Sequence, residues 1–121
     1  VTLHCPKTKE TTDMFSTQEF EAMKSTSILI NCARGGIVNE KALYDALTNN
    51  KIRSAGLDVY DDEPSTSSNP LFSLGNILLS PHIAGVTQEA TIRMSKQAVQ
   101  NVLDVFDNKV DPDVIINKNV L

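Results

Sequence analysis

The sequence contains no tryptophan and only two cysteines among its 121 residues. Both cysteines, Cys5 and Cys32, lie at the ends of apolar runs, where a small reduced thiol packs well, and neither belongs to a CxxC pair. We therefore expect free thiols, with neither a disulfide nor a metal site.

Basic residues are too few and too scattered to form a nucleic-acid surface. Lysine and arginine number 11 against 15 aspartate and glutamate, for a formal net charge of -4. Without a basic stripe the chain cannot neutralise a phosphate backbone, and no apolar run approaches the roughly 20 residues that cross a bilayer. No basic segment with an apolar run after it opens the sequence. We expect no nucleic-acid or membrane partner and a cytoplasmic location.

The composition is that of a globular domain, with 40% hydrophobic and 21% charged residues. Short β-rich runs are each followed by a helical pattern, which predicts an α/β fold, a parallel sheet with crossover helices. The expected strands are residues 1–5, 27–33, 54–60 and 76–80, and the expected helices are residues 18–24, 40–49 and 88–106.

Local signals support these elements. Ser16 and Glu19 fit a capping box before the first helix, and Asn39 can cap the second. The second strand, SILINCA, is apolar without alternation, which is typical of a strand covered on both faces. Pro, Ser and Asn in residues 61–70 indicate a loop, and residues 111–121 are expected to run out as an extended tail.

Chemically capable side chains follow the predicted strands. Ligands bind at the carboxyl ends of parallel strands, where loops and helix N-termini converge. Arg34 follows the second strand, Asp58 and Glu63 follow the third, and His82 follows the fourth. Taken singly, each has a simpler interpretation: a surface arginine, an aspartate that caps a loop, a solvated glutamate and an ordinary loop histidine.

Together these residues match the needs of a 2-oxo acid. The planar fork of arginine binds a carboxylate in two places, and imidazole titrates near neutral pH and can exchange a proton. A carboxylate on the other ring nitrogen would fix the tautomer. The set suits reversible reduction of a 2-oxo acid with hydride from a cofactor. Gly35 and Gly36 permit backbone shapes and close approaches that a side chain would block, and they are expected to make room for substrate and cofactor.

Four ordered motifs carry a family resemblance: LHCPKTKETTDMF, MKSTSILINCARGGIVNEKAL, SAGLDVYDDEP and NILLSPHIAG. The chain resembles the D-isomer-specific 2-hydroxyacid dehydrogenases, and within them it looks most like the D-3-phosphoglycerate dehydrogenase branch. The resemblance runs from Leu3 to the long helix, and four such motifs in order seldom coincide by chance.

The resemblance implies NAD as cofactor, a small 2-oxo or 2-hydroxy acid as substrate, and a role for each matched residue. Arg34 would bind the substrate carboxylate, His82 would be the general acid and base, and Glu63 would pair with His82. Asp58 would contact the nicotinamide carboxamide. The implied cofactor-binding residues are Cys5, Pro6, Cys32, Ala33, Arg34, Asp58, His82 and Gly85.

One expected motif is absent from the sequence. The five glycines, at positions 35, 36, 56, 75 and 85, cannot form the GxGxxG phosphate-binding turn of this family. Residues 1–110 are therefore expected to be the second half of a Rossmann-type NAD-binding domain, with 111–121 as a tail leading to a substrate domain. The chain also opens directly in a strand-like run at Val1, as part of a longer protein would.

Several consequences and alternatives stay open at this point. The first strand is expected to be an unpaired sheet edge that favours homo-oligomers, and this chain alone is expected to bind NAD weakly and to be inactive. The alternatives are a glyoxylate or hydroxypyruvate reductase of the same family and a non-enzymatic, NAD(H)-sensing module like the related corepressors. A flavodoxin-like signalling domain would leave the arginine, glutamate and histidine unexplained.

Overall fold

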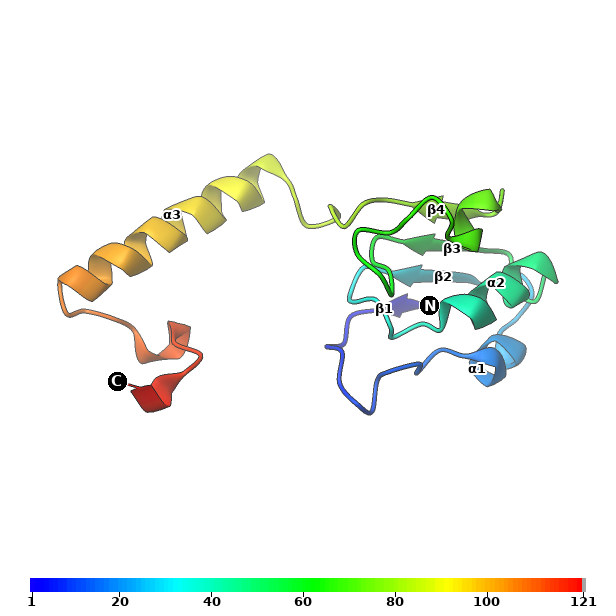
Figure 1. The fold of residues 1–121 in the computed structure, drawn as a ribbon, viewed down its shortest axis with the longest axis horizontal. Coiled ribbons are helices and arrows are strands. Elements are labelled where there is room, and N and C mark those ends of the chain that lie inside the picture. Colours follow the sequence, from blue (N-terminus) through cyan, green and yellow to red (C-terminus); the bar gives the residue numbers. More distant parts are fainter. Residues whose placement is uncertain (121) are drawn as a thin grey trace. The chain divides into compact units, whose positions relative to one another are not determined.

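Four parallel strands lie side by side in chain order in the computed structural model, which describes residues 1–120 (Figure 1). The strands are β1 (Thr2–Leu3), β2 (Ile28–Asn31), β3 (Ser54–Leu57) and β4 (Ile77–Leu79). They belong to a compact unit, Val1–Ala84, and a second unit comprises Gly85–Leu121. The predicted parallel sheet with crossover helices is confirmed.

Two helices of the first unit connect the strands. Helix α1 (Thr17–Ala22) begins with the predicted capping box, in which the backbone N–H of Ser16 donates to Glu19 Oε2 over 2.9 Å. Helix α2 (Glu40–Thr48) begins at Asn39, whose side chain accepts the N–H of Ala42 over 2.9 Å. A short 3₁₀ helix, η1 (Pro70–Ser73), ends the predicted loop. Local capping chemistry therefore sets where these helices begin.

The hydrophobic core lies between the sheet and the apolar faces of α1 and α2. Phe20 of α1 and Leu43 and Leu47 of α2 pack with Leu29 and Leu57 of the sheet, and all five are at most 3% exposed. Ile28 and Ile30, which alternate with Leu29, are only half-buried. The prediction that β2 is covered on both faces is wrong for the described residues. Crossovers of one hand from β1 to β2 and from β2 to β3 place both helices on one face.

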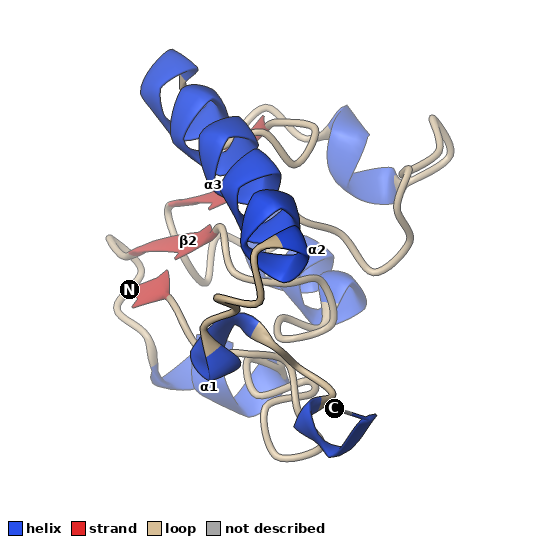
Figure 2. Ribbon diagram, turned by 90° about the vertical axis from the view of Figure 1, so that its left-hand side faces the viewer, coloured by secondary structure: helices blue, strands red, loops and turns tan. Residues whose placement is uncertain are grey.

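The strand register aligns the ends from which the site is built. Leu3 pairs with Asn31, Asn31 with Leu57, and Leu57 with Leu79, so the four strands end in one row. All four are shorter than predicted, and the residues that follow them form loops at this edge, as Figure 2 shows by the short red strands among tan segments. The loops after the strands thus begin at one common level.

The second unit begins with the long predicted helix, α3 (Gln88–Phe106), capped by Thr87, whose Oγ1 accepts the N–H of Ala90 over 3.1 Å. None of its residues is buried. The predicted extended tail is wrong for the described residues, which form 3₁₀ turns η2 (Pro112–Val114) and η3 (Lys118–Val120). Asp111 favours the first of these turns by accepting the N–H of Asp113 over 2.9 Å. The tail's last residue, Leu121, lies outside the described residues. No helix that the structure describes is long and apolar enough to cross a membrane.

Candidate active site

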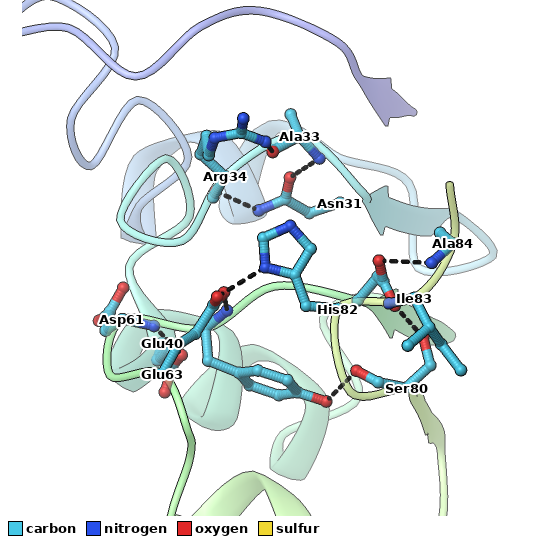
Figure 3. A network of polar contacts seen from close by, with 12 residues as sticks. Asn31, Ala33, Arg34, Glu40, Asp61, Glu63, Ser80, His82, Ile83 and Ala84 are labelled. Atoms are coloured by element: carbon cyan, nitrogen blue, oxygen red, sulfur yellow. Dashed lines mark hydrogen bonds and ion pairs between the residues drawn. The ribbon is translucent and has the colours of Figure 1, made fainter. Parts of the chain in front are cut away.

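His82 and Glu63 form a direct pair at the carboxyl edge of the sheet. His82 Nδ1 lies 2.6 Å from Glu63 Oε2, and the two side chains are 48% and 34% exposed (Figure 3). The second oxygen, Oε1, accepts the backbone N–H of Tyr60 over 2.9 Å. Glu63 therefore contacts the imidazole with Oε2, while Oε1 is held by the backbone of the segment that follows β3.

The pairing determines which atom carries the shared proton. The hydrogen bond from His82, followed by that from the Tyr60 N–H, lowers the pKa of Glu63 below its ordinary value. Glu63 is therefore ionised at neutral pH and has no proton to give, so Nδ1 must carry the shared proton. The Nε2 atom is left as the ring position that can take up or release a proton.

The loop that carries Glu63 is anchored to helix α2. Glu40, the first residue of α2, accepts the backbone N–H of Asp61 with Oε1 over 2.7 Å and the amide of Asn69 with Oε2 over 2.8 Å. Both carboxylate oxygens thus hold a segment rich in Pro and Ser that makes no sheet or α-helix pairing. A charged acceptor at a helix start restrains the position of this loop.

Asp58 shapes the loop that carries His82. This residue is 3% exposed, and its carboxylate accepts Ser80 Oγ over 2.6 Å and the backbone N–H groups of Ile83 and Ala84 over 2.8 and 2.9 Å. Between them, His82 has a φ of 56°, a left-handed conformation that costs energy for a non-glycine residue. The buried carboxylate therefore stabilises the backbone turn that presents the imidazole.

Hydrogen bonding keeps Asp58 ionised in spite of its burial. Burial by itself raises the pKa of this carboxyl, but the hydrogen bonds from Ser80, Ala84 and Ile83 outweigh it, and the pKa lies below its ordinary value. Of the two interpretations open from the sequence, the loop-capping one describes these contacts. Its contact with the nicotinamide carboxamide stays a prediction.

Arg34 is presented by the turn after β2. Asn31, 1% exposed, donates from Nδ2 to the carbonyl of Arg34 over 3.0 Å and accepts the Ala33 N–H with Oδ1 over 3.1 Å. The guanidinium donates to the Ala33 carbonyl over 2.7 Å and does not contact the His82–Glu63 pair directly. In Figure 3, Asn31 and Arg34 lie on the side of the imidazole away from Ser80. The turn presents the guanidinium on this side of the imidazole, with one of its donors bonded to the Ala33 carbonyl.

A hollow of about 620 Å³ lies beyond the ends of β1 and β2. Its lining includes all the predicted cofactor residues of these two strand ends: Cys5, Pro6, Cys32, Ala33 and Arg34. Cys5 is half-buried and Cys32 is exposed. The hollow lies at the edge strand β1, outside the carboxyl ends of the strands, where nucleotides bind in doubly wound sheets. That these residues line the nicotinamide end of the cofactor stays a prediction. Among the described residues, no glycine-rich turn is present to hold a pyrophosphate.

Gly35, the first residue of the double glycine, allows two backbone segments to approach closely. A β-carbon on Gly35 would overlap the carbonyl of Tyr60, and Gly36 has a φ of 77° with the Lys7 side chain beside it. The expectation that these glycines leave room for substrate and cofactor is therefore corrected for Gly35, whose space is taken by the chain after β3. This close approach positions the Arg34 turn against the segment leading to Glu63.

The structure adds residues that sequence reasoning missed, and one predicted residue belongs to the second unit. Tyr60 and Ser80 gave no signal, because an aromatic residue and a serine at strand ends are common. Asn31 could have been noticed as an amide in an apolar run. Gly85, predicted to pass near the nicotinamide, belongs to the second unit, with no atom within 4 Å of an added β-carbon, and its role stays a prediction.

A parallel α/β sheet with a carboxylate-paired histidine and an arginine at its carboxyl edge defines the class of Rossmann-type dehydrogenase domains. Within that class the family is also defined. Residues 1–84 match the model of the D-isomer specific 2-hydroxyacid dehydrogenase, NAD binding domain, and the chain belongs to this family. NAD is therefore the cofactor of the domain, as predicted.

Relatives and solved structures share this fold but differ in their activities. The chain is 42% identical over 105 residues to D-3-phosphoglycerate dehydrogenase of Archaeoglobus fulgidus, covering 87% of this chain and 20% of that protein. It is 38% identical over 121 residues to glyoxylate reductase of Korarchaeum cryptofilum, covering 100% and 36%. It matches the NAD-complexed D-isomer specific 2-hydroxyacid dehydrogenase of Lactobacillus delbrueckii ssp. bulgaricus with a TM-score of 0.84 and 29% identity, covering 97% and 39%. The chain thus spans well under half the length of each.

Proposed function

We propose that this chain is the acid–base half of the NAD-binding domain of a longer D-2-hydroxyacid dehydrogenase. The observation that carries the proposal is the 2.6 Å contact between His82 Nδ1 and Glu63 Oε2, because it frees Nε2 to exchange a proton with a substrate oxygen. Residues 1–110 would belong to this domain and 111–121 would lead to a substrate domain. A cytoplasmic location and a homo-oligomeric enzyme complete the proposal.

Each of the site residues would have a separate role in the proposed reaction. In reduction, the His82 Nε2–H would give its proton to the substrate oxygen, while Glu63 stabilises the imidazolium before that transfer. Arg34 would hold the substrate carboxylate with two parallel N–H donors. NAD(H), when bound, supplies or accepts the hydride at the substrate's second carbon. Cys5, Pro6, Cys32 and Ala33 would line the nicotinamide end, Asp58 would lie at its carboxamide, and Gly85 would pass near it.

His82→Ala in the full-length protein tests the proposal. We expect kcat to fall by about 10²-fold or more while NADH affinity stays unchanged, because the proton donor is lost and the hollow at β1 and β2 is not. The matched control is Lys41→Ala, which removes an exposed side chain of α2 that pairs with Asp45 over 2.9 Å and lies outside both the His82–Glu63 pair and the hollow. Unchanged turnover in His82→Ala would remove this residue from the mechanism. NADH binding without any turnover in the unmutated protein would favour the NAD(H)-sensing alternative.

For the substrate we propose D-3-phosphoglycerate. The 42% identity to a D-3-phosphoglycerate dehydrogenase supports this choice. A glyoxylate or hydroxypyruvate reductase is the second candidate, supported by the glyoxylate reductase relative that matches all 121 residues. The test compares kcat/KM for 3-phosphoglycerate oxidation with kcat/KM for glyoxylate and hydroxypyruvate reduction. A preference for either small oxo acid by about 10²-fold would reverse the assignment.

A further inference from the structure

We propose that Tyr60 is a positioning residue that fixes Glu63 and His82 relative to each other. The proposal rests on the function proposed above, since it concerns the same pair. Neither the ordering of the sequence motifs nor the family match singles out this tyrosine. Its contacts do, because its backbone N–H bonds Glu63 and its hydroxyl bonds the loop that carries His82.

The first contact holds the carboxylate. Tyr60 follows β3 by three positions, and its backbone N–H donates to Glu63 Oε1 over 2.9 Å. That bond directs the opposite oxygen, Oε2, toward the imidazole at 2.6 Å. The carboxylate is therefore oriented by the backbone of the segment that follows β3.

The second contact holds the loop of the histidine. The Tyr60 hydroxyl donates to the backbone carbonyl of Ser80 over 2.9 Å, two residues before His82. The Asp58 carboxylate bonds Ser80 Oγ, before His82, and the N–H groups of Ile83 and Ala84, after it. Asp58 and Tyr60 lie two positions apart on one chain segment. Together they restrain the loop on both sides of the left-handed residue.

The ring of Tyr60 is itself held in place. The residue is 7% exposed, and the ring meets Phe72 edge to face, with centroids 5.9 Å apart and planes at 82°. Burial, followed by the nearby Asp58 and Glu40 charges, raises the pKa of the phenol, so the hydroxyl stays a hydrogen-bond donor throughout the neutral range. The phenol therefore links the segment after β3 to the loop after β4 in a fixed geometry.

The test removes only the hydroxyl and observes the imidazole directly. The chain has two histidines, His4 and His82, so ¹⁵N-histidine labelling gives two ring systems, with His4 as the internal reference. In the unmutated chain we expect His82 to be the Nδ1–H tautomer, whereas free imidazole favours Nε2–H. Tyr60→Phe is expected to shift the His82 ring ¹⁵N resonances toward the Nε2–H tautomer and leave those of His4 in place.

Two further variants keep the outcome decisive. Tyr44→Phe is the matched control, because Tyr44 is also partly buried against the core and lies on α2, outside the site. It should shift neither histidine. Phe72→Leu keeps the hydroxyl but loosens the ring, and should shift His82 in the same direction by less. If His82 resonates identically in the folded unmutated, Tyr60→Phe and Phe72→Leu chains, the proposal is overturned.

Kinetics of the full-length enzyme separate this proposal from the proposed function. Tyr60→Phe should lower kcat by about 5- to 10-fold and move the acidic limb of its pH profile, with KM for NADH unchanged. A Tyr60→Phe pH profile equal to that of the unmutated enzyme would contradict the positioning role. An effect on the His82 resonances together with full activity of His82→Ala would instead overturn the proposed function and leave the positioning of the pair established.

Discussion

The carbonyl oxygen of Tyr60 occupies the place where a β-carbon on Gly35 would stand. The turn that presents Arg34 therefore lies directly against the chain segment that leads to Glu63. Two parts of the site, from neighbouring strands, are therefore in contact only because residue 35 has no side chain.

Gly35→Ala is expected to destabilise the protein by about 2–4 kcal/mol, because a backbone carbonyl cannot move aside as a flexible side chain can. Urea unfolding followed by circular dichroism measures the change. Gly75→Ala is the matched control, since no atom lies within 4 Å of a β-carbon there. Equal stability of the two variants would mean that the β3 segment is not held against the Arg34 turn.

Asp58→Asn is expected to lower stability at neutral pH by about 2 kcal/mol, because a charged acceptor of three hydrogen bonds is replaced by an amide whose NH₂ faces donors. The pKa of Asp58 is depressed in the folded chain, so its contribution is full above the ordinary aspartate pKa of about 3.9 and is lost as pH falls through the lower folded value. Unfolding measured from pH 7 to pH 2 should therefore show a weaker loss at acid pH in Asp58→Asn.

The control for this pH dependence is Asp45→Asn, which removes an exposed carboxylate paired with Lys41 over 2.9 Å. Such a surface pair contributes about 0–1 kcal/mol. An acid limb that is equally steep in Asp58→Asn and the unmutated chain would show that Asp58 does not carry it.

Glu63→Gln is expected to lower kcat of the full-length enzyme by about 10- to 100-fold, since a neutral amide no longer favours the charged imidazole. The pKa of Glu63 is depressed, so the carboxylate stays ionised down to below its ordinary pKa of about 4.3. Steady-state kinetics at neutral pH measure kcat, and KM for NADH should stay unchanged in the variant. Glu19→Gln, at the capping box of α1, is the control and should leave kcat unchanged. A kcat of Glu63→Gln equal to that of the unmutated enzyme would show that the carboxylate has no part in the reaction.

Thr2→Pro is expected to reduce self-association of the chain. Val1 bonds β2 through its amine and its carbonyl, at 2.8 Å to Ile28 and 2.9 Å from Ile30, so the backbone groups of Thr2 point away from β2 at the sheet edge. Proline removes the N–H there, whereas the control Thr2→Val keeps it. Sedimentation velocity over a concentration series measures the difference. Equal association of the two variants would exclude pairing through β1.

Periodicity and capping residues predicted most of the fold, because these signals are local. Helix α3 begins after Thr87 as expected, and both the Ser16–Glu19 capping box and the Asn39 cap form as predicted. The strands are shorter than their apolar runs because Asn31 and Asp58 use their side chains to hold the following loops. The turn that begins after Asp111 escaped prediction because a single side-chain bond, not a pattern, favours it.

The candidate site was predictable only in so far as its residues directly follow predicted strands. The carboxyl ends of parallel strands meet at one edge, so His82, Glu63 and Arg34 could be expected there together. The Tyr60 bonds could not, because they depend on the distance between two loops that no residue type encodes. The purpose of Gly35 was misjudged for the same reason, since a close approach of backbones has no signature beyond the glycine itself.

The left-handed backbone at His82 limits which residues can replace this histidine. With a φ of 56°, this position accepts glycine, asparagine or aspartate at small cost and rejects β-branched residues. Laboratory evolution that swaps the proton carrier must therefore either choose among a few short side chains or rebuild the loop along with it. The proton-carrying side chain at this position and the backbone conformation of its loop therefore constrain each other.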